Sequence, residues 1–397
     1  MYLTSEEEAM LRGDMGEIIA QSMRLLEAIG KAYGAEKLIP VKSAHVSGIS
    51  YNTIGEAGLE YLSGIASEEI GCRTLTTINP AGMELEDPKK LNTPREFAEK
   101  QYKVVKCFEK IKAKITCTCT PYLCGNRPLR GDHVAWAESS AVVFVNSIIG
   151  ASSNREGGPA SLASALTGRT PYYGYHIEEN RRPNVEILLE LELGDELDFS
   201  LLGYVIGERI TGVPFIRGRA LKPSLKEIKV FGASAAASGD LALYHWENIT
   251  PESRRHRDSI GSMEHISIDR RDLEDVLDRL STAERPDAIC LGCPHLSLSE
   301  LYEIASMLRG RRLNKRLFCF TSRTVYQEAL KRGLIRDIEG AGGKVVRDTC
   351  MVVSPLKDAG IYEMETNSCK AAYYSPNLNG VSVRLSNMKR SLQGALS

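Results

Sequence analysis

The spacing of hydrophobic and polar positions is most regular in the last third of the chain, where short apolar runs alternate with amphipathic ones. Three apolar runs of this region predict strands: DAICLGC, KRLFCFTS and KVVRDTCMVV. Residues 297–312 and 324–342 carry the longer helical period between them. This alternation is typical of βαβ units and a parallel sheet. Ligands of such sheets bind beyond the carboxyl ends of the strands.

The first half of the chain gives a less regular pattern of helices and strands. Thr4 and Glu7 form a capping box that predicts a helix over residues 5–13, and an amphipathic helix follows over residues 15–33. TLTTINPAGM and KITCTCTPYL predict strands, with a helix over residues 95–114 between them. Residues 201–245 are expected to combine strands with small-residue loops, among them GASAAASGD. The prediction is an α/β protein with two regions, residues 1–225 and 226–397.

Length and composition narrow the class of protein. The chain has 397 residues, more than one core usually spans, with 43% apolar and 25% charged residues. Its 50 basic and 51 acidic residues leave a net charge of −1, which gives no support for a nucleic-acid or membrane partner. No apolar stretch is long enough to span a bilayer, and the acidic N-terminus lacks an apolar signal core. We therefore expect a cytoplasmic protein.

Cysteines occur in three separate segments, each where an apolar run meets a Gly/Pro turn. The segments read CTCTPYLCGN (Cys117, Cys119, Cys124), CLGCPH (Cys290, Cys293) and RDTCMVV (Cys350). No second closely spaced pair follows Cys293, so a zinc ribbon is excluded. One thiolate from each segment could hold three irons of a 4Fe–4S cluster and leave the fourth iron open. That arrangement indicates a Lewis-acid hydro-lyase rather than an electron carrier.

Two points about these cysteines stay open. Cys117 and Cys119 face the same side of the predicted strand, and Cys119, nearer its end, is the better ligand candidate. The Cys290-x-x-Cys293 spacing also fits a redox pair, although no thioredoxin-like context surrounds it.

The densest set of acid–base groups follows the first cysteine segment. Asp132 could orient the imidazole of His133, and Glu138 on an otherwise apolar helix is costly to bury without a partner. The alternative is a helix N-cap by Asp132 and a surface glutamate. Arg155 suits a bidentate grip on a carboxylate or phosphate, and a structural salt bridge explains it as well.

Three further places combine small residues, turns or a cation. The loop that contains Gly48 and Ser50 precedes a predicted helix and could cradle an anion with backbone N–H groups, or be a capped turn. Asn79–Pro80 ends a strand and could point into a cleft or form a turn. Lys370, within TNSCKAAYY, could pair with a substrate anion or be solvated.

With these motifs identified, the chain resembles the aconitase X family. The segments that carry the resemblance are KSAHVSGISYNTIGEAGLEYL, CTPYLCGNRPLRGDHVAWAESSAVVFVNSIIGASSNREGGP, GCPHLSLSEL, RDTC and TNSCKAAYY. The resemblance implies an aconitase-like fold of α/β/α layers around an iron–sulfur site. Cys119, Cys293 and Cys350 match the family's cluster-binding cysteines by position. Positions that match its substrate site are Gly48, Ile49, Ser50, Asn79, Pro80, Glu138, Ser139, Ser368 and Lys370.

Within the first segment, the sequence SGISYNTIGEAG is similar to that of the archaeal branch of the family. The resemblance then implies dehydration of (R)-5-phosphomevalonate to trans-anhydromevalonate 5-phosphate. It also implies a separate small subunit, a swivelling domain that contributes a serine, in a heterodimer or higher assembly. In this hypothesis, His133, oriented by Asp132, or Glu138 protonates the leaving hydroxyl. The loop 48–50 and Lys370 bind the phosphate.

Three alternatives remain open from the sequence. The first is a cis-3-hydroxy-L-proline dehydratase on the same scaffold, the second a non-catalytic iron–sulfur protein, and the third an α/β enzyme without a cluster. The three cysteines alone also fit a 3Fe–4S cluster, a smaller cluster or a single iron.

Overall fold

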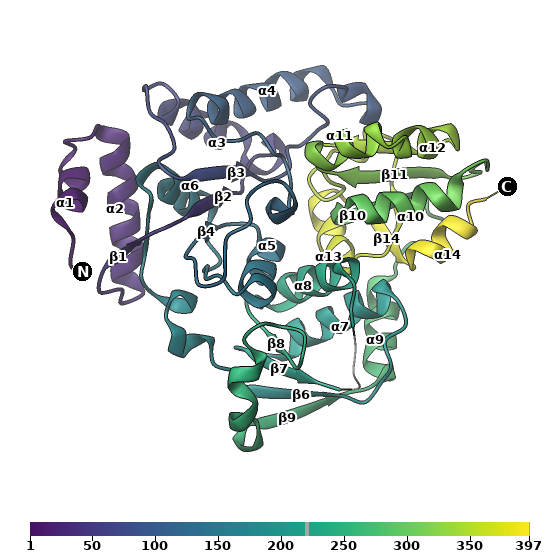
Figure 1. The fold of residues 1–397 in the computed structure, drawn as a ribbon. Coiled ribbons are helices and arrows are strands. Elements are labelled where there is room, and N and C mark those ends of the chain that lie inside the picture. Colours follow the sequence, from purple (N-terminus) through teal and green to yellow (C-terminus); the bar gives the residue numbers. More distant parts are fainter. Residues whose placement is uncertain (219–221, 397) are drawn as a thin grey trace.

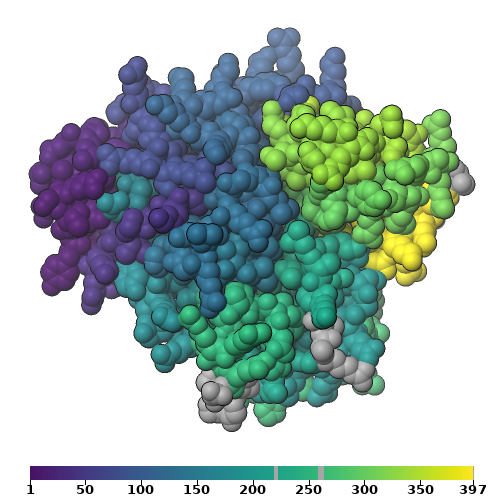
Figure 2. Space-filling view, viewed as in Figure 1, coloured from purple at the N-terminus to yellow at the C-terminus, as the bar shows by residue number. Residues whose placement is uncertain are grey.

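The computed structural model describes residues 1–218 and 222–396, without the side chains of residues 258–262. They form three adjoining α/β units, each built around its own parallel sheet (Figure 1). Figure 2 shows the N-terminal unit (purple to blue) adjoining both the middle unit (teal to green) and the C-terminal unit (light green to yellow). The predicted α/β class with parallel sheets is confirmed. Among the described residues, no helix combines the length and apolar character needed to cross a membrane.

The N-terminal unit contains a three-stranded parallel sheet in the order β3-β2-β4 and a separate antiparallel pair, β1-β5. Its strands are β1 (Leu38–Pro40), β2 (Ser43–Val46), β3 (Leu75–Ile78), β4 (Ala135–Trp136) and β5 (Arg169–Pro171). Its longer helices are α1 (Ser5–Arg12), α2 (Glu17–Ala32), α3 (Tyr51–Ile65), α4 (Arg95–Lys110), α5 (Ser139–Phe144) and α6 (Gly158–Thr167). The capping box predicted at Thr4 and Glu7 begins α1, as expected.

The middle unit has a four-stranded parallel sheet in the order β8-β7-β6-β9. Its strands are β6 (Val185–Leu189), β7 (Pro214–Arg217), β8 (His245–Trp246) and β9 (Glu264–Ile268). Its helices are α7 (Glu196–Arg209), α8 (Leu225–Gly239), α9 (Arg270–Leu280) and the short η6 (Ser253–Ser262). The short helices η4 (Gly174–His176) and η5 (Glu178–Arg181) connect the N-terminal unit to it. The border expected between residues 225 and 226 falls inside this unit, within α8.

The small-residue stretch GASAAASGD is not a loop, as its composition suggested, but the second half of α8. Alanine is the best helix former, and the small side chains let α7 approach closely. A Cβ on Gly203 of α7 would lie 2.2 Å from the carbonyl oxygen of Phe231, and one on Gly207 would lie 2.3 Å from that of Ala235. The low complexity of the stretch therefore serves helix packing.

The C-terminal unit has the five-stranded parallel sheet that the sequence predicted, in the order β12-β11-β10-β13-β14. Its strands are β10 (Ala288–Leu296), β11 (Arg316–Thr321), β12 (Lys344–Arg347), β13 (Glu363–Thr366) and β14 (Ser382–Leu385). Its helices are α10 (Leu298–Leu308), α11 (Arg323–Lys331), α12 (Leu334–Gly340), α13 (Cys369–Leu378) and α14 (Met388–Gln393). The strand order reverses between β10 and β13, and such a switch point is where open α/β sheets bind ligands.

Candidate active site

Three cysteines lie where the N-terminal and C-terminal sheets meet. Cys119 belongs to the segment that follows α4 and runs beside β3, since the N–H of Thr118 donates to the carbonyl of Ile78 at 3.0 Å. Cys293 lies in the last part of β10, and Cys350 follows β12 by three residues. Parallel strands direct their carboxyl ends to one edge of the sheet. The fold therefore brings one cysteine of each segment to the same junction.

His295, two residues after Cys293, joins the three cysteine segments. Its backbone N–H donates to the Sγ of Cys119 at 3.2 Å. Its Nε2 donates to the carbonyl of Thr349 at 2.9 Å, and its Nδ1 lies 3.0 Å from the Oγ1 of Thr118. Because a carbonyl only accepts, Nδ1 is the acceptor for the threonine hydroxyl. One buried histidine thus fixes the relative positions of the segments that carry the thiols.

The three thiols are buried and interact electrostatically. Cys119, Cys293 and Cys350 are 7%, 5% and 8% exposed. Burial raises the pKa of all three, that of Cys350 to about 12. After burial, Glu138 and Cys350 raise the pKa of Cys119, and Cys293 raises that of Cys350. The sulfurs are therefore close enough to act as one group, neutral until a bound metal removes their protons.

The three sulfurs do not all lie within 4.8 Å of one another, so they are not gathered around a single tetrahedral ion. Within the described residues, the one set of three or more potential ligand atoms that all lie within 4.8 Å of one another contains no cysteine. A single zinc ion with bonds of about 2.3 Å would hold its thiolates about 3.8 Å apart. Cys119, Cys293 and Cys350, buried and with a backbone N–H on one sulfur, are suitable donors for an iron–sulfur cluster.

Beside the thiols, Glu138 and Lys370 form a buried ion pair. The Nζ of Lys370 contacts the Oε1 of Glu138 and lies 3.4 Å from the Oγ of Ser139. Asn79 donates to the other carboxylate oxygen at 2.8 Å, and Ser140 donates to Oε1 at 2.7 Å. Burial by itself raises the pKa of Glu138, but Lys370 and these donors outweigh it and lower the pKa to about 2. Both members of the pair are charged at neutral pH.

His45 extends this network into the N-terminal sheet. Its Nε2 lies 3.3 Å from the Oδ1 of Asn79, and its Nδ1 lies 2.8 Å from the Oγ1 of Thr77. Since Asn79 uses its amide nitrogen on Glu138, its Oδ1 accepts from His45. Burial lowers the pKa of His45 to about 4, so the ring is neutral. His45, Asn79 and Glu138 form a fixed chain of donors and acceptors that ends on Lys370.

The loop before α3 is tied to both halves of the junction. The Oγ of Ser50 donates to the carbonyl of Val353 at 3.2 Å. Gln101 of α4 donates to the carbonyl of Ile49 at 2.8 Å and accepts from the N–H groups of Tyr51 and Gly82 at 2.9 and 2.8 Å. The loop is therefore held by side chains from the helix behind it and by the segment after Cys350.

The remaining matched positions lie at the same edge or beside it. Ser368 caps α13, accepts from the N–H of Ala371 at 3.1 Å, and also interacts with the thiol of Cys293. Pro80 is buried directly after β3. Gly48, with φ of +80°, lines a cavity of about 130 Å³ among apolar side chains of α3, α4 and α6.

Family models match nearly the whole chain. Models of the aconitase X first, second and third domains match residues 1–179, 183–278 and 286–397. The chain belongs to the aconitase X family. The motif-based prediction of the family is therefore confirmed. Aconitase X domain borders near residues 180 and 280 also coincide with the limits of the three sheets.

Individual relatives match this chain over nearly its whole length. The phosphomevalonate dehydratase large subunit of Methanocaldococcus jannaschii is 44% identical over 402 residues, 99% of this chain and 100% of that protein. The crystal structure of Thermococcus kodakaraensis aconitase X in its holo-form has a TM-score of 0.92 at 42% identity and covers 100% of both chains. A cis-3-hydroxy-L-proline dehydratase of Pseudomonas aeruginosa is 31% identical, over 99% of this chain and 70% of its own length. The aconitase-like fold is confirmed.

Two predicted site residues, Asp132 and His133, lie away from the cysteines. His133 precedes β4 and Glu138 follows it, so they are at opposite ends of the strand. The Nδ1 of His133 lies 3.0 Å from that of His176, and the Oδ2 of Asp132 accepts from the N–H of Leu129 at 2.8 Å. The imidazole is therefore paired with a second histidine, and the carboxylate caps a turn.

Arg155 lies nearer the junction but is engaged on the surface. Its guanidinium pairs with Asp240 at 2.5 Å, and that carboxylate is 92% exposed. The next residue, Glu156, donates its N–H to the carbonyl of Trp136 at the carboxyl end of β4. Exposed ion pairs are weak, so the guanidinium is available to a stronger anion.

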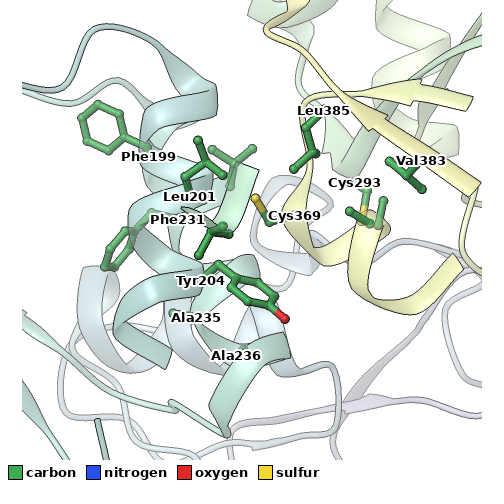
Figure 3. Close-up of a cluster of buried hydrophobic side chains, with 14 of the residues drawn as sticks. Phe199, Leu201, Tyr204, Phe231, Ala235, Ala236, Cys293, Cys369, Val383 and Leu385 are labelled. Carbon is green, nitrogen blue, oxygen red and sulfur yellow. The ribbon is translucent and has the colours of Figure 1, made fainter. Parts of the chain in front are cut away.

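Sequence reasoning missed several residues that position the site. His295, Gln101 and His45 were not singled out, and neither was the buried pair of Lys229 with Glu300, whose Nζ and Oε2 are 2.6 Å apart. Lys229 also donates to the carbonyl of His295 at 2.7 Å. The one signal in the sequence was the position of His295 two residues from a ligand candidate. By contrast, Cys369 lies among apolar side chains of α7 and α8, as a core residue does (Figure 3).

Proposed function

We propose that this chain is the large, catalytic subunit of a dehydratase that converts (R)-5-phosphomevalonate into trans-anhydromevalonate 5-phosphate and water. The full-length identity to archaeal relatives with the name phosphomevalonate dehydratase large subunit supports this substrate. The hydroxyproline dehydratases are less similar and extend beyond the region that this chain matches. The observation that carries the proposal is the convergence of three buried thiols with the Lys370–Glu138 pair at a sheet switch point.

In this proposal, Cys119, Cys293 and Cys350 hold a 4Fe–4S cluster. When bound, the cluster supplies an iron with an open position, a Lewis acid that stabilises charge on the departing hydroxyl. The thiols suit this role because they are buried, come from three segments and are fixed by His295. The Ser368 hydroxyl beside Cys293 further orients that ligand.

Lys370 and Glu138 then act as a positioned cation and its counter-ion. The ammonium of Lys370 is a largely buried cation next to the thiols, and it attracts an anionic group of the substrate. Glu138, with a pKa of about 2, is ionised at neutral pH and cannot donate a proton in this state. We therefore assign Glu138 to holding Lys370 and Asn79 in place rather than to protonating the leaving group. His133 is not assigned to this step, because it lies at the other end of β4.

A small subunit completes the enzyme in this proposal. Relatives carry the words large subunit in their names, which implies a separate partner for them. The elimination breaks the C3–O bond and removes a proton from C2, so a base must face C2. We place that base, a serine, on the small subunit, which would close over the junction as a swivelling domain.

The test is an anaerobic preparation of this chain with its small subunit, assayed with 5-phosphomevalonate and with cis-3-hydroxy-L-proline, with iron measured on the same sample. Turnover of the phosphate substrate by an iron-loaded complex is expected. Turnover of hydroxyproline alone would be consistent with the mechanism but would show that the substrate assignment is wrong. An active complex without iron would overturn the cluster, and inactivity of the iron-loaded complex with both substrates would overturn the function.

A further inference from the structure

A second group of potential metal ligands lies in the middle unit. The ligand atoms of His245, Glu252 and His256 all lie within 4.8 Å of one another. His245 is on β8, Glu252 is in the following turn, and His256 is on η6, the short helix drawn beside this sheet in Figure 1. The rings of the two histidines are 4.6 Å apart between centroids. Two imidazoles and one carboxylate are donors that zinc and similar ions prefer.

His245 is buried, and one of its nitrogens has no partner. The Nε2–H donates to the backbone carbonyl of Arg181 at 2.7 Å. Because a carbonyl accepts only, Nε2 carries the proton and Nδ1 carries the free lone pair. That Nδ1 has no hydrogen-bond partner, although the residue is 1% exposed.

His245 and Glu252 each have a hydrogen-bond partner of the kind that orients metal ligands in known sites. A ligating histidine usually donates its other N–H to a carbonyl, and a ligating carboxylate is usually hydrogen-bonded as well. Here Arg181 supplies both contacts. Its carbonyl accepts from His245, and its guanidinium donates to both oxygens of Glu252 at 3.0 and 3.2 Å. Each carboxylate oxygen keeps a second lone pair for another partner.

A large cavity opens beside this group. It has a volume of about 1060 Å³, and Glu252 and His256 are among the side chains that line it. Four arginines line it as well, of which Arg181 pairs with Glu252 and Arg255 pairs with Glu178 at 3.2 Å. These pairs offset part of the positive charge that would oppose a cation. The cavity gives solvent access to the coordination positions that three protein ligands leave open.

We propose that His245 Nδ1, Glu252 and His256 bind one divalent transition-metal ion of the zinc type, with water from the cavity completing its coordination. The site is separate from the three cysteines and lies within one unit. The ion would tie η6 to β8 and take the position that faces the unpaired nitrogen of His245. Its role is to order the wall of the cavity, and it does not depend on the dehydratase proposal.

The test uses the complex with its small subunit and its cluster in place, equilibrated with Zn²⁺ and then freed of excess metal. We expect one zinc per chain by elemental analysis, with a nitrogen and oxygen shell at about 2.0–2.1 Å by X-ray absorption at the zinc edge. His256→Ala should weaken zinc binding by at least about 100-fold, since the loss of an outer partner alone costs up to that factor. His256 is half-buried, so this variant is expected to fold.

Two control variants distinguish this site from other histidines. His265→Ala removes an exposed histidine of β9, and His133→Ala removes one that lines the same cavity. Both should retain the bound zinc. A sulfur shell around the zinc, unchanged affinity in His256→Ala, or loss of zinc in His133→Ala would each overturn the proposal, as would the absence of bound zinc in the unaltered complex.

Discussion

The cysteine site (Cys119, Cys293 and Cys350 with Glu138 and Lys370) and the histidine site (His245, Glu252 and His256) differ in how their polar atoms are satisfied. Of the buried side-chain nitrogens and oxygens that the structure describes, those of His45, Glu138, His295 and Lys370 all have partners, whereas Nδ1 of His245 has none. Unpaired buried groups are costly and rare. In the cysteine site, the polar atoms are already paired and the sulfurs are free to bind metal. In the histidine site, the nitrogen atom Nδ1 of His245 is the atom free to bind metal.

The largest effect is expected from removing one of the three sulfurs of the cysteine site. Cys293→Ser should eliminate the cluster and reduce dehydration by at least about a thousand-fold, because Lewis-acid stabilisation contributes several kcal/mol. Iron content and activity are measured on the same anaerobic sample. Cys290→Ala, on the same strand and equally buried, is the matched control and should keep its iron. A fully active Cys293→Ser protein would show that the ligand assignment is wrong.

The next largest effect is expected from the buried ion pair. Lys370→Met leaves the carboxylate of Glu138 buried without its cation, which should cost about 3–5 kcal/mol in the free energy of unfolding. The double variant with Glu138→Gln should recover most of that loss, because both charges are then gone. Urea unfolding of the cluster-free protein measures both. Equal stability of Lys370→Met and the unaltered chain would contradict the pair's burial.

The same pair predicts a dependence of stability on pH. The pKa of Glu138 is about 2 in the folded chain and 4.5 ordinarily, so its contribution is complete above pH 4.5 and is lost as the pH falls toward 2. One such carboxyl adds a slope of up to about 1.4 kcal/mol per pH unit over that window. In cluster-free protein, Glu138→Gln should make the free energy of unfolding depend less on pH below pH 4.5. An unchanged pH dependence in this variant would mean that other carboxylates cause the acid unfolding.

Hydrophobic patterning predicted more of the fold than of the site. The βαβ order of the C-terminal unit and the cysteines at its strand ends followed from periodicity, because strand ends converge by topology. His45 escaped detection because all four residues of β2 are buried, so alternation could not show which face it occupies. Asp132 and His133 are only six and five residues before Glu138, yet the two-residue strand β4 between them places them at the opposite edge. Contacts such as His295 with Thr118 join positions too distant in sequence to be inferred from spacing.

His295 tests whether the cysteine site depends on side-chain links as well as on topology. His295→Gln should lose at least one of its two side-chain hydrogen bonds. Thr118 keeps its contacts with Thr120, so the larger loss is at the buried carbonyl of Thr349, at a cost of about 1–3 kcal/mol. Iron occupancy should fall with it. Thermal unfolding and iron content are the measurements, and His265→Gln on the surface should stay within about 0.5 kcal/mol. Unchanged iron retention in His295→Gln would mean that the backbone alone sets the positions of the thiols.

The smallest expected effect on stability concerns Arg155, whose neighbour Glu156 bonds to the carboxyl end of β4. Its pair with exposed Asp240 contributes at most about 1 kcal/mol, so both Arg155→Gln and Asp240→Asn should unfold close to the unaltered chain. The two variants should differ in their KM for the phosphorylated substrate. If the guanidinium turns from Asp240 to a substrate anion, Arg155→Gln should raise the KM for the phosphorylated substrate about tenfold or more, since hydrogen bonds to charged groups contribute about 1.5–3 kcal/mol. Asp240→Asn retains the guanidinium of Arg155 and removes its ion pair, so the KM of this variant should equal that of the unaltered enzyme or be lower. A rise in KM of the same size in both variants would mean that Arg155 acts only through its ion pair, and it would remove this residue from the substrate site.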